Sequence, residues 1–249
     1  MKHLLMALAC LTMLSLSAQE DDGYIMYQSI LLTAKDGHAQ QLTQGVKAHN
    51  EKYHTEGAQS VNVWQINSGP RAGSMFWVKG PLTWTDMDTP LDTDGHMDDW
   101  WANVAPHAHT GEWNWWRLMD DMNYVPDGFE AGVAVVRYFD IKPDKWNNAV
   151  HIWETIFKLY EENDWDMALQ IYTNQANSGN DWDWAIMWHH TNWASMDNNR
   201  GFFGKYEEMY GIDRDEFFEG WNEASEFMGM EIIALRKDLS VLDDTQGND

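Results

Sequence analysis

Residues 181–197, DWDWAIMWHHTNWASMD, concentrate tryptophan and histidine in one short segment. A neutral imidazole can transfer protons or bind a metal, and indole rings pack well on planar ligands. If residues 182–190 form a strand, alternation places His189 on one face and the tryptophans with His190 on the other. The tryptophans concerned are Trp182, Trp184 and Trp188. We interpret this segment as a candidate ligand-binding site with His189 or His190 as the proton-transfer group; an aromatic core strand is the alternative.

A second group of residues suggests metal chemistry. In His107-Ala-His109, two imidazoles would share one side of a strand, a pattern that suits zinc, copper or non-haem iron. Glu112 follows closely and His96 lies upstream. However, the adjacent proline, threonine and glycine are typical of a loop, so we keep His107 and His109 only as an alternative metal site.

Other catalytic signatures are absent from the sequence. It contains no G-x-S-x-G, P-loop, G-x-G-x-x-G or H-E-x-x-H motif. These absences argue against motif-bearing hydrolases, kinases and dinucleotide-dependent enzymes.

Composition narrows the class of partner. The 249 residues include 16 Lys and Arg against 40 Asp and Glu, a formal net charge of −24. Nucleic acids and anionic membranes require clustered basic residues, so we expect neither as a partner. The chain has one cysteine, Cys10, and 16 tryptophans. Such an excess of tryptophan suits an aromatic ligand pocket, and it also suits a core rich in indole rings.

The first residues predict export. Residues 1–18 combine Lys2, an apolar run and small residues before Gln19, which is the pattern of a secretory signal peptide cleaved near Ala18. We therefore expect a secreted or periplasmic protein. Ala7 stands where a lipobox before Cys10 would have leucine, so lipid anchoring is not favoured. No other apolar run approaches eighteen residues, so we expect no membrane insertion.

The sequence after residue 18 contains an internal duplication. Landmarks of the first half recur in the second at nearly constant spacing: Lys35 with Lys142, Tyr53 with Tyr160, Asn67-Ser68-Gly69 with Asn177-Ser178-Gly179, Trp84 with Trp193, and Arg117 with Arg236. This duplication predicts one unit over residues 19–125 and a second over 126–238. Residues 239–249 are expected to form a disordered acidic tail.

Each half predicts the same order of elements. We expect strands over 24–34 and 132–141, helices over 37–55 and 143–163, strand pairs over 60–67 with 74–79 and 168–176 with 182–190, helical segments over 95–105 and 201–228, and strands over 112–119 and 230–237. The last helical segment is interrupted near Gly211. The order β-α-β-β-α-β is that of a ferredoxin-like unit, which predicts an α+β fold.

A single such unit leaves one apolar sheet face exposed, and two units can cover each other. The duplication, the element order and the Trp-x-x-Met-Asp sequences at Trp84 and Trp193 resemble the dimeric α/β-barrel superfamily in its tandem, fused form. This resemblance covers nearly all of the chain after residue 18. It implies two ferredoxin-like units packed sheet to sheet within one chain, as a monomer or a homodimer.

The resemblance says less about function, because members include monooxygenases, isomerases and haem proteins. It implies a ligand between a sheet and its covering helices, with a histidine that binds haem or moves protons. In haem-dependent members an arginine is expected beside it, and Arg137 can serve where its counterpart Ile30 cannot; pairing of Arg137 with a carboxylate is the alternative. Trp153, on the apolar stripe of the second unit's first helix, joins the candidate ligand-binding residues.

We therefore expect a small-molecule protein. It would bind an apolar or aromatic molecule in a pocket of the second half, with or without monooxygenase- or isomerase-like conversion. The cofactor is open: none, or haem as the alternative. A further alternative is a non-catalytic extracellular protein that binds carbohydrate or another ligand.

Overall fold

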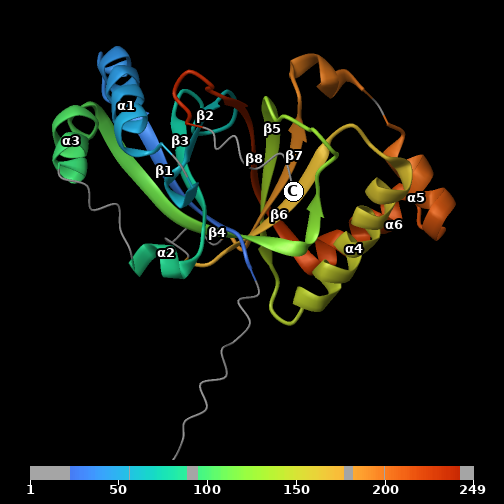
Figure 1. Cartoon of the computed structure of the whole chain (residues 1–249). Helices are drawn as coiled ribbons and strands as arrows, with labels where there is room; N and C mark the ends of the chain where they lie inside the picture. The colour runs from blue at the N-terminus through green and yellow to red at the C-terminus, as the bar shows by residue number, and fades with distance from the viewer. Residues whose placement is uncertain (1–22, 56, 89–94, 177–181, 199, 242–249) are drawn as a thin grey trace, which may run out of the picture.

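The computed structural model describes residues 23–55, 57–88, 95–176, 182–198 and 200–241 (Figure 1). The first half consists of β1 (Met26–Ala34), α1 (Ala39–Tyr53), η1 (Gly57–Gln59), β2 (Val61–Ile66), β3 (Met75–Leu82), α2 (Trp84–Asp88), α3 (His96–Asn103), η2 (Ala105–His107) and β4 (Ala108–Tyr124). The second half consists of β5 (Val133–Ile141), α4 (Trp146–Asn163), β6 (Ala168–Asn174), β7 (Trp184–His190), η3 (Trp193–Asp197), α5 (Phe202–Tyr210), α6 (Arg214–Ala224) and β8 (Ser225–Leu235). The predicted α+β class and element order are confirmed.

The boundaries differ most at the last strand of each half. β4 begins at Ala108 and continues to Tyr124, well beyond the predicted 112–119, because it pairs with β1 and then with β6 of the other half. β8 begins at Ser225. The predicted interruption of the second helical segment falls at Gly211, which adopts a positive φ of 70° between α5 and α6.

The eight strands found among the described residues close into one barrel. Their order is β1-β3-β2-β8-β5-β7-β6-β4, so the two four-stranded sheets meet at the β2–β8 and β4–β6 edges. Alternation sends one face of each sheet into the barrel, where side chains of both halves pack together. They include Leu31, Trp64, Phe76, Val136, Tyr138, Tyr172 and Ala185. The two units are thus packed sheet face to sheet face, as expected of a tandem dimeric α/β-barrel.

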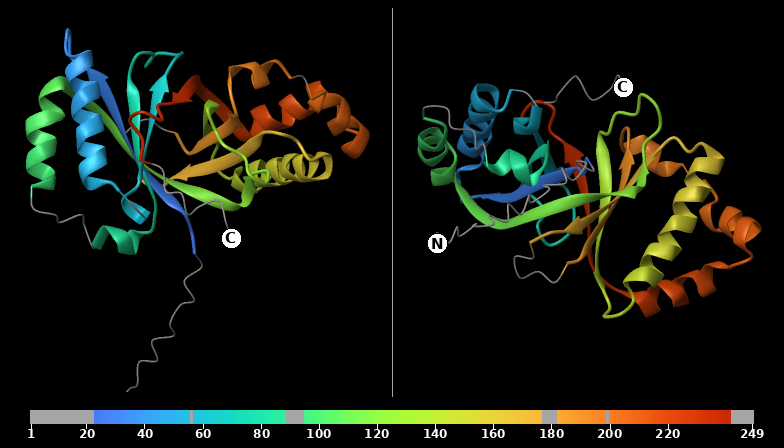
Figure 2. Two further views of the ribbon diagram at one scale, coloured as in Figure 1. Left: turned by 45° about the horizontal axis from the view of Figure 1, so that its top comes forward. Right: turned by 60° about the horizontal axis from the view of Figure 1, so that its bottom comes forward.

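Helices cover the outer face of each sheet, as the two views of Figure 2 show. α1 and α3 pack on the first sheet around Leu42, Val46, Trp77 and Trp100. α4, α5 and α6 pack on the second sheet around a larger aromatic core. In the described part of the chain, no helix has the combination of length and apolarity that crossing a membrane requires.

The chain end corrects one prediction. Leu239 is 2% exposed and belongs to the core of the first half, and Val241 pairs with Val61 of β2. Residues 239–241 are therefore bound rather than part of a disordered tail, because Leu239 supplies apolar surface that the first half lacks. Residues 242–249 and the predicted signal peptide, residues 1–18, lie outside the described residues.

Candidate functional site

Strand β7 separates the two predicted histidines. Within the strand, Trp184, Ile186 and Trp188 face the helices, whereas Ala185 and Met187 face the barrel interior. Alternation therefore sends His189 into the barrel and His190 toward the helices. The sequence-based assignment of opposite faces is confirmed, and each histidine lines a different cavity.

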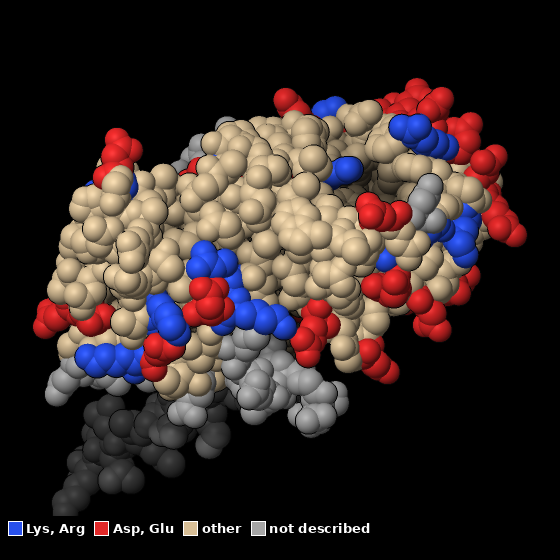
Figure 3. Space-filling model, turned by 90° about the horizontal axis from the view of Figure 1, so that it is seen from above, with Lys and Arg blue, Asp and Glu red and all other residues tan. Residues whose placement is uncertain are grey.

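The cavity on the helix side has a volume of about 860 Å³ and lies between the second sheet and its helices. It brings together four of the predicted residues: Arg137, Trp153, Trp188 and His190. Further walls come from Phe202, Phe203, Phe217, Phe218, Trp221, Phe227 and Met230. Phe227 and Met230 on β8 are 58% and 41% exposed, so apolar surface faces solvent there. Figure 3 shows a hollow on the side of the second half, with basic and acidic side chains at its rim.

Two residues that line this cavity each have one buried polar atom without a hydrogen-bond partner among the described residues: Trp153 Nε1 and His190 Nδ1. The Trp153 ring contacts Trp188 edge-on at 5.8 Å between centroids and Trp221 at 5.5 Å. These contacts fix the indole without satisfying its N–H. Because burying an unpaired polar group is unfavourable, a bound molecule with an acceptor would stabilise this arrangement.

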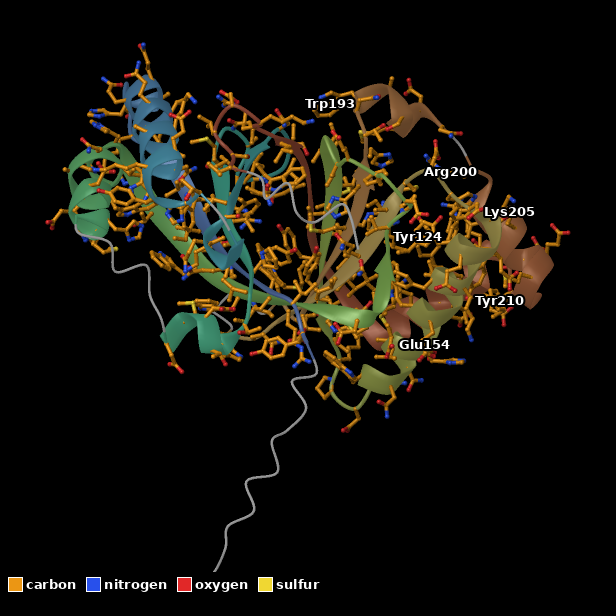
Figure 4. The ribbon with its side chains drawn as sticks, viewed as in Figure 1. Tyr124, Glu154, Trp193, Arg200, Lys205 and Tyr210 are labelled. Atoms are coloured by element: carbon orange, nitrogen blue, oxygen red, sulfur yellow. The ribbon has the colours of Figure 1, made fainter. Side chains whose placement is uncertain are left out.

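Three arginines line the same cavity. The Arg137 guanidinium lies 5.2 Å from the Trp188 ring centre, and Arg214 lies over Phe203 and Phe218 at 5.7 and 5.8 Å. Arg200 donates from Nε and Nη2 to Asp166 Oδ1 at 2.9 and 2.6 Å. Figure 4 shows Arg200 in the segment that leads into α5, which carries Lys205 and Tyr210. The cavity thus concentrates cations in a strongly acidic chain.

The electrostatics favour a neutral His190. Burial lowers the pKa of His190, and the positive charge of Arg200 lowers it further, while Asp166 and a hydrogen bond to the backbone of Ser195 act in the opposite direction. At neutral pH the imidazole is therefore uncharged, so it can accept a proton or donate a lone pair to a metal.

The barrel interior holds a smaller cavity of about 210 Å³, lined by His189 and Trp182 among others. Burial lowers the pKa of His189 to about 4. Neither of its ring nitrogens has a hydrogen-bond partner among the described residues. Arg71 also lines this cavity, and it donates from Nε and Nη2 to both carboxylate oxygens of Glu231, at 2.8 and 2.7 Å. Sequence reasoning missed this buried pair, since its members belong to different halves.

The other two predicted tryptophans take different places. Trp182 was expected beside Trp188 and His190, but it precedes the start of β7, where strand alternation no longer applies. It lies in the barrel cavity, stacked on Tyr138 with 4.1 Å between ring centres and under the Arg71 guanidinium. Trp184 is fully buried and packs against Trp146 and Trp221 without lining either cavity.

The alternative metal pair lies elsewhere, at the start of β4. His107 ends η2 and His109 is an exposed residue of β4. The nearest imidazole to His107 is that of His38, with 2.9 Å between the two Nδ1 atoms. Metal binding by His107 and His109 stays a prediction.

A third cluster was not predicted from the sequence. His49 of α1, His54 just after α1 and His96 at the start of α3 place one ring nitrogen each within 4.8 Å of one another. His49 and His54 are five residues apart, which is not a same-face spacing on a helix. His96 reaches them only because α3 packs on α1. The three histidines of the cluster could therefore be seen together only in the folded chain.

Comparison with known protein families finds no match to this sequence, and none is found among curated proteins. Solved structures do resemble it. A candidate chlorite dismutase has a TM-score of 0.52 with 11% identity, over 86% of this chain and 96% of that chain. A candidate monooxygenase from Lactobacillus acidophilus NCFM has a TM-score of 0.54 with 12% identity, over 86% and 94%. A variant of chlorite dismutase from Candidatus Nitrospira defluvii has a TM-score of 0.52 with 8% identity, over 86% and 92%. At this level of identity the similarity concerns the fold, and the chain has the dimeric α/β-barrel fold in its tandem form.

Proposed function

We propose that the protein binds a small, largely apolar or aromatic molecule with an acidic group in the helix-side cavity of its second half. The observation that carries the proposal is the cavity of about 860 Å³ in which Trp153 Nε1 and His190 Nδ1 are buried without partners. This volume lies within the range of roughly 300–1,000 Å³ that small-molecule sites occupy.

Different lining residues would contact different parts of the bound molecule. The aromatic side chains of α4, α5, α6 and β7 supply apolar surface for a ring system. Arg137 and Arg214 offer positive charge to a carboxylate or a comparable anion, because guanidinium pairs well with planar oxyanions; Arg200 is held by Asp166. The exposed Phe227 and Met230 would be covered by the bound molecule.

The same geometry supports proton transfer at His190. Its uncharged imidazole can take a proton from a bound carbon acid, and the guanidinium of Arg137 in the same cavity can stabilise the anion that results. Return of the proton to a second position would complete an isomerisation. Among the proteins that share its fold, two are named as candidate monooxygenases.

The test uses anilinonaphthalene sulfonate, a planar, apolar and anionic fluorescent probe. We expect one probe per chain, and a loss of affinity of about tenfold in His190→Gln, since one hydrogen bond to a buried group contributes about 1.4 kcal/mol. His189→Gln is the matched control, one residue away but facing the barrel. Equal loss in both variants, or binding of monosaccharides in place of the probe, would contradict the proposal.

Haem is the second candidate ligand, and the described lining residues fit it. His190 is the one histidine among them, its imidazole is neutral, and the walls are aromatic. His190 would hold the iron, while Arg137 and Arg214 would pair with the propionates. Bound haem would supply oxidative chemistry. Haem titration should then give a Soret band that His190→Ala removes and His189→Ala retains; no band in the unmodified protein would exclude this ligand.

A further inference from the structure

We propose that His49, His54 and His96 form a binding site for a divalent transition-metal ion, with zinc as the reference metal. This site lies in the first half, outside both cavities. His54 Nε2 is 3.3 Å from His49 Nε2 and 3.3 Å from His96 Nε2. His49 and His54 are 0% and 1% exposed.

The spacing of the nitrogens matches metal coordination. Histidine nitrogens bind tetrahedral zinc at 2.0–2.1 Å, so two of them on one ion lie roughly 3.3–3.4 Å apart. The His54 nitrogen has this separation from both neighbours. The rings of His49 and His96 are stacked, with 4.9 Å between centres and planes 28° apart, so both enter the cluster from a similar direction.

Hydrogen bonds on the outer ring nitrogens fix the tautomers. His49 Nδ1 is 2.8 Å from Asp99 Oδ2, and His54 Nδ1 is 2.8 Å from the backbone oxygen of Gln59. Each oxygen accepts, so both Nδ1 atoms carry the hydrogen. In the neutral rings the two Nε2 atoms then present lone pairs to each other at 3.3 Å with no hydrogen between them. A cation between these nitrogens converts the repulsion into attraction.

The supporting shell is also that of a metal site. Metal-binding histidines regularly donate their other ring N–H to a carboxylate or to a backbone carbonyl, and here one histidine does each. Asp99 is itself held by Asn103 Nδ2, which donates to its Oδ1 at 2.8 Å. This second bond fixes the carboxylate that orients His49.

The chemistry of the donors indicates the class of ion. Three neutral imidazoles without thiolate suit zinc, copper, nickel or ferrous iron and disfavour calcium and magnesium, which require oxygen ligands. A tetrahedral ion would keep one position for water or another ligand. Among charged side chains nearby, Asp99 would attract the ion. The half-buried Lys79 acts on His54 and His96 as a like charge and would weaken binding, and Lys52 acts on His49 in the same way.

The experiment titrates the metal-stripped full-length protein with zinc against a chromophoric chelator, and with cobalt to record ligand-field spectra. We expect one zinc per chain, a tetrahedral cobalt spectrum and a higher melting temperature with zinc. Asp99→Asn should weaken zinc binding by roughly 10–100-fold. His96→Ala should weaken it more, and Lys79→Met should strengthen it.

The control is His151→Ala, which removes an exposed histidine of α4 outside the cluster and should leave affinity unchanged. His96 is only half-buried, so its replacement is compatible with folding, and melting curves without zinc verify this for each variant. Absence of zinc binding in the unmodified protein would overturn the proposal. So would binding that survives His96→Ala and Asp99→Asn, or that His151→Ala abolishes.

Discussion

The two halves share one sequence pattern and one order of elements, yet they use the space between sheet and helices differently. In the second half this space is a cavity of about 860 Å³. In the first half the corresponding space is filled by Trp77, Trp100 and the histidine cluster, whose rings contact one another. The scaffold thus tolerates either a hollow or a packed layer, and the side chains between sheet and helix decide which forms.

Gly45 shows how the size of a side chain affects the packing of α1 on α3. Gly45 of α1 lies so close to α3 that a Cβ atom there would overlap the carbonyl oxygen of Asn103. At the offset that relates Tyr53 to Tyr160, the residue equivalent to Gly45 is Ile152 of α4. The equivalent of His49 is Ile156, which lines the cavity. A glycine lets the helices of the first half approach closely, whereas in the second half the larger Ile152 packs beside Gly220 of α6.

The largest effect should come from breaking this close approach. Gly45→Ala should lower the free energy of unfolding by about 3 kcal/mol, because the methyl group meets backbone that cannot rotate away. It should also weaken zinc binding, since α3 carries His96. Gly204→Ala is the matched control, because Gly204 is helical and has no atoms near its Cβ position. Denaturant unfolding measures both, and similar stability of the two variants would contradict this account of the packing.

A smaller effect should follow from making the second half resemble the first at one position. Arg137→Ile introduces the residue found at the equivalent position, Ile30, and removes a cation from the cavity. Affinity for the anionic probe should fall about tenfold, the lower end for a hydrogen bond to a charged group. Fluorescence titration measures this. Arg236→Gln, which disrupts an exposed ion pair with Asp238, should leave affinity unchanged; an equal loss there would point to a general effect of charge.

The smallest effect concerns the barrel shared by both halves. His189→Leu should stabilise the protein by about 1 kcal/mol at pH 7, because it removes two buried nitrogens without partners. Burial lowers the pKa of His189 from its ordinary value of 6.5 to about 4, so the unfolded chain binds the proton more readily. Native stability from this residue is therefore lost as the pH falls from 6.5 toward 4.

The advantage of His189→Leu should accordingly grow on acidification, as measured by thermal melts across that range. His109→Leu, at an exposed position, should change stability by less than about 0.5 kcal/mol. Destabilisation by His189→Leu at all pH values would show that the imidazole has a partner in solution.

The periodicity of apolar residues determined how much of the fold and of the candidate site could be predicted from the sequence. Alternation and helical spacing located the strands and helices, and period two correctly separated His189 from His190. It could not tell that His190 lines a cavity of about 860 Å³ and His189 one of about 210 Å³, because cavity size depends on how far the helices stand from the sheet. Trp182 shows a related limit. It lies before the start of β7, so alternation within the strand does not predict which face of the sheet it takes.

The contacts that could not be predicted from the sequence join segments that are far apart in the chain. His49 and His96 meet only through packing of α1 on α3, and Arg71 meets Glu231 only through closure of the barrel. Neither pair has a spacing that a linear pattern reveals. The expected export of the chain and the metal pair His107 and His109 stay predictions.

The buried Leu239 has a consequence for synthesis. The first half emerges from the ribosome before the second, and domains usually fold in that order. Here the earlier half receives part of its core from Leu239, and the backbone oxygen of Leu239 accepts a hydrogen bond from Asn50 on α1 at 2.7 Å. The first half cannot complete its packing until residue 239 has been made. The first half, which is synthesised first, thus completes its core only after the second half has been synthesised.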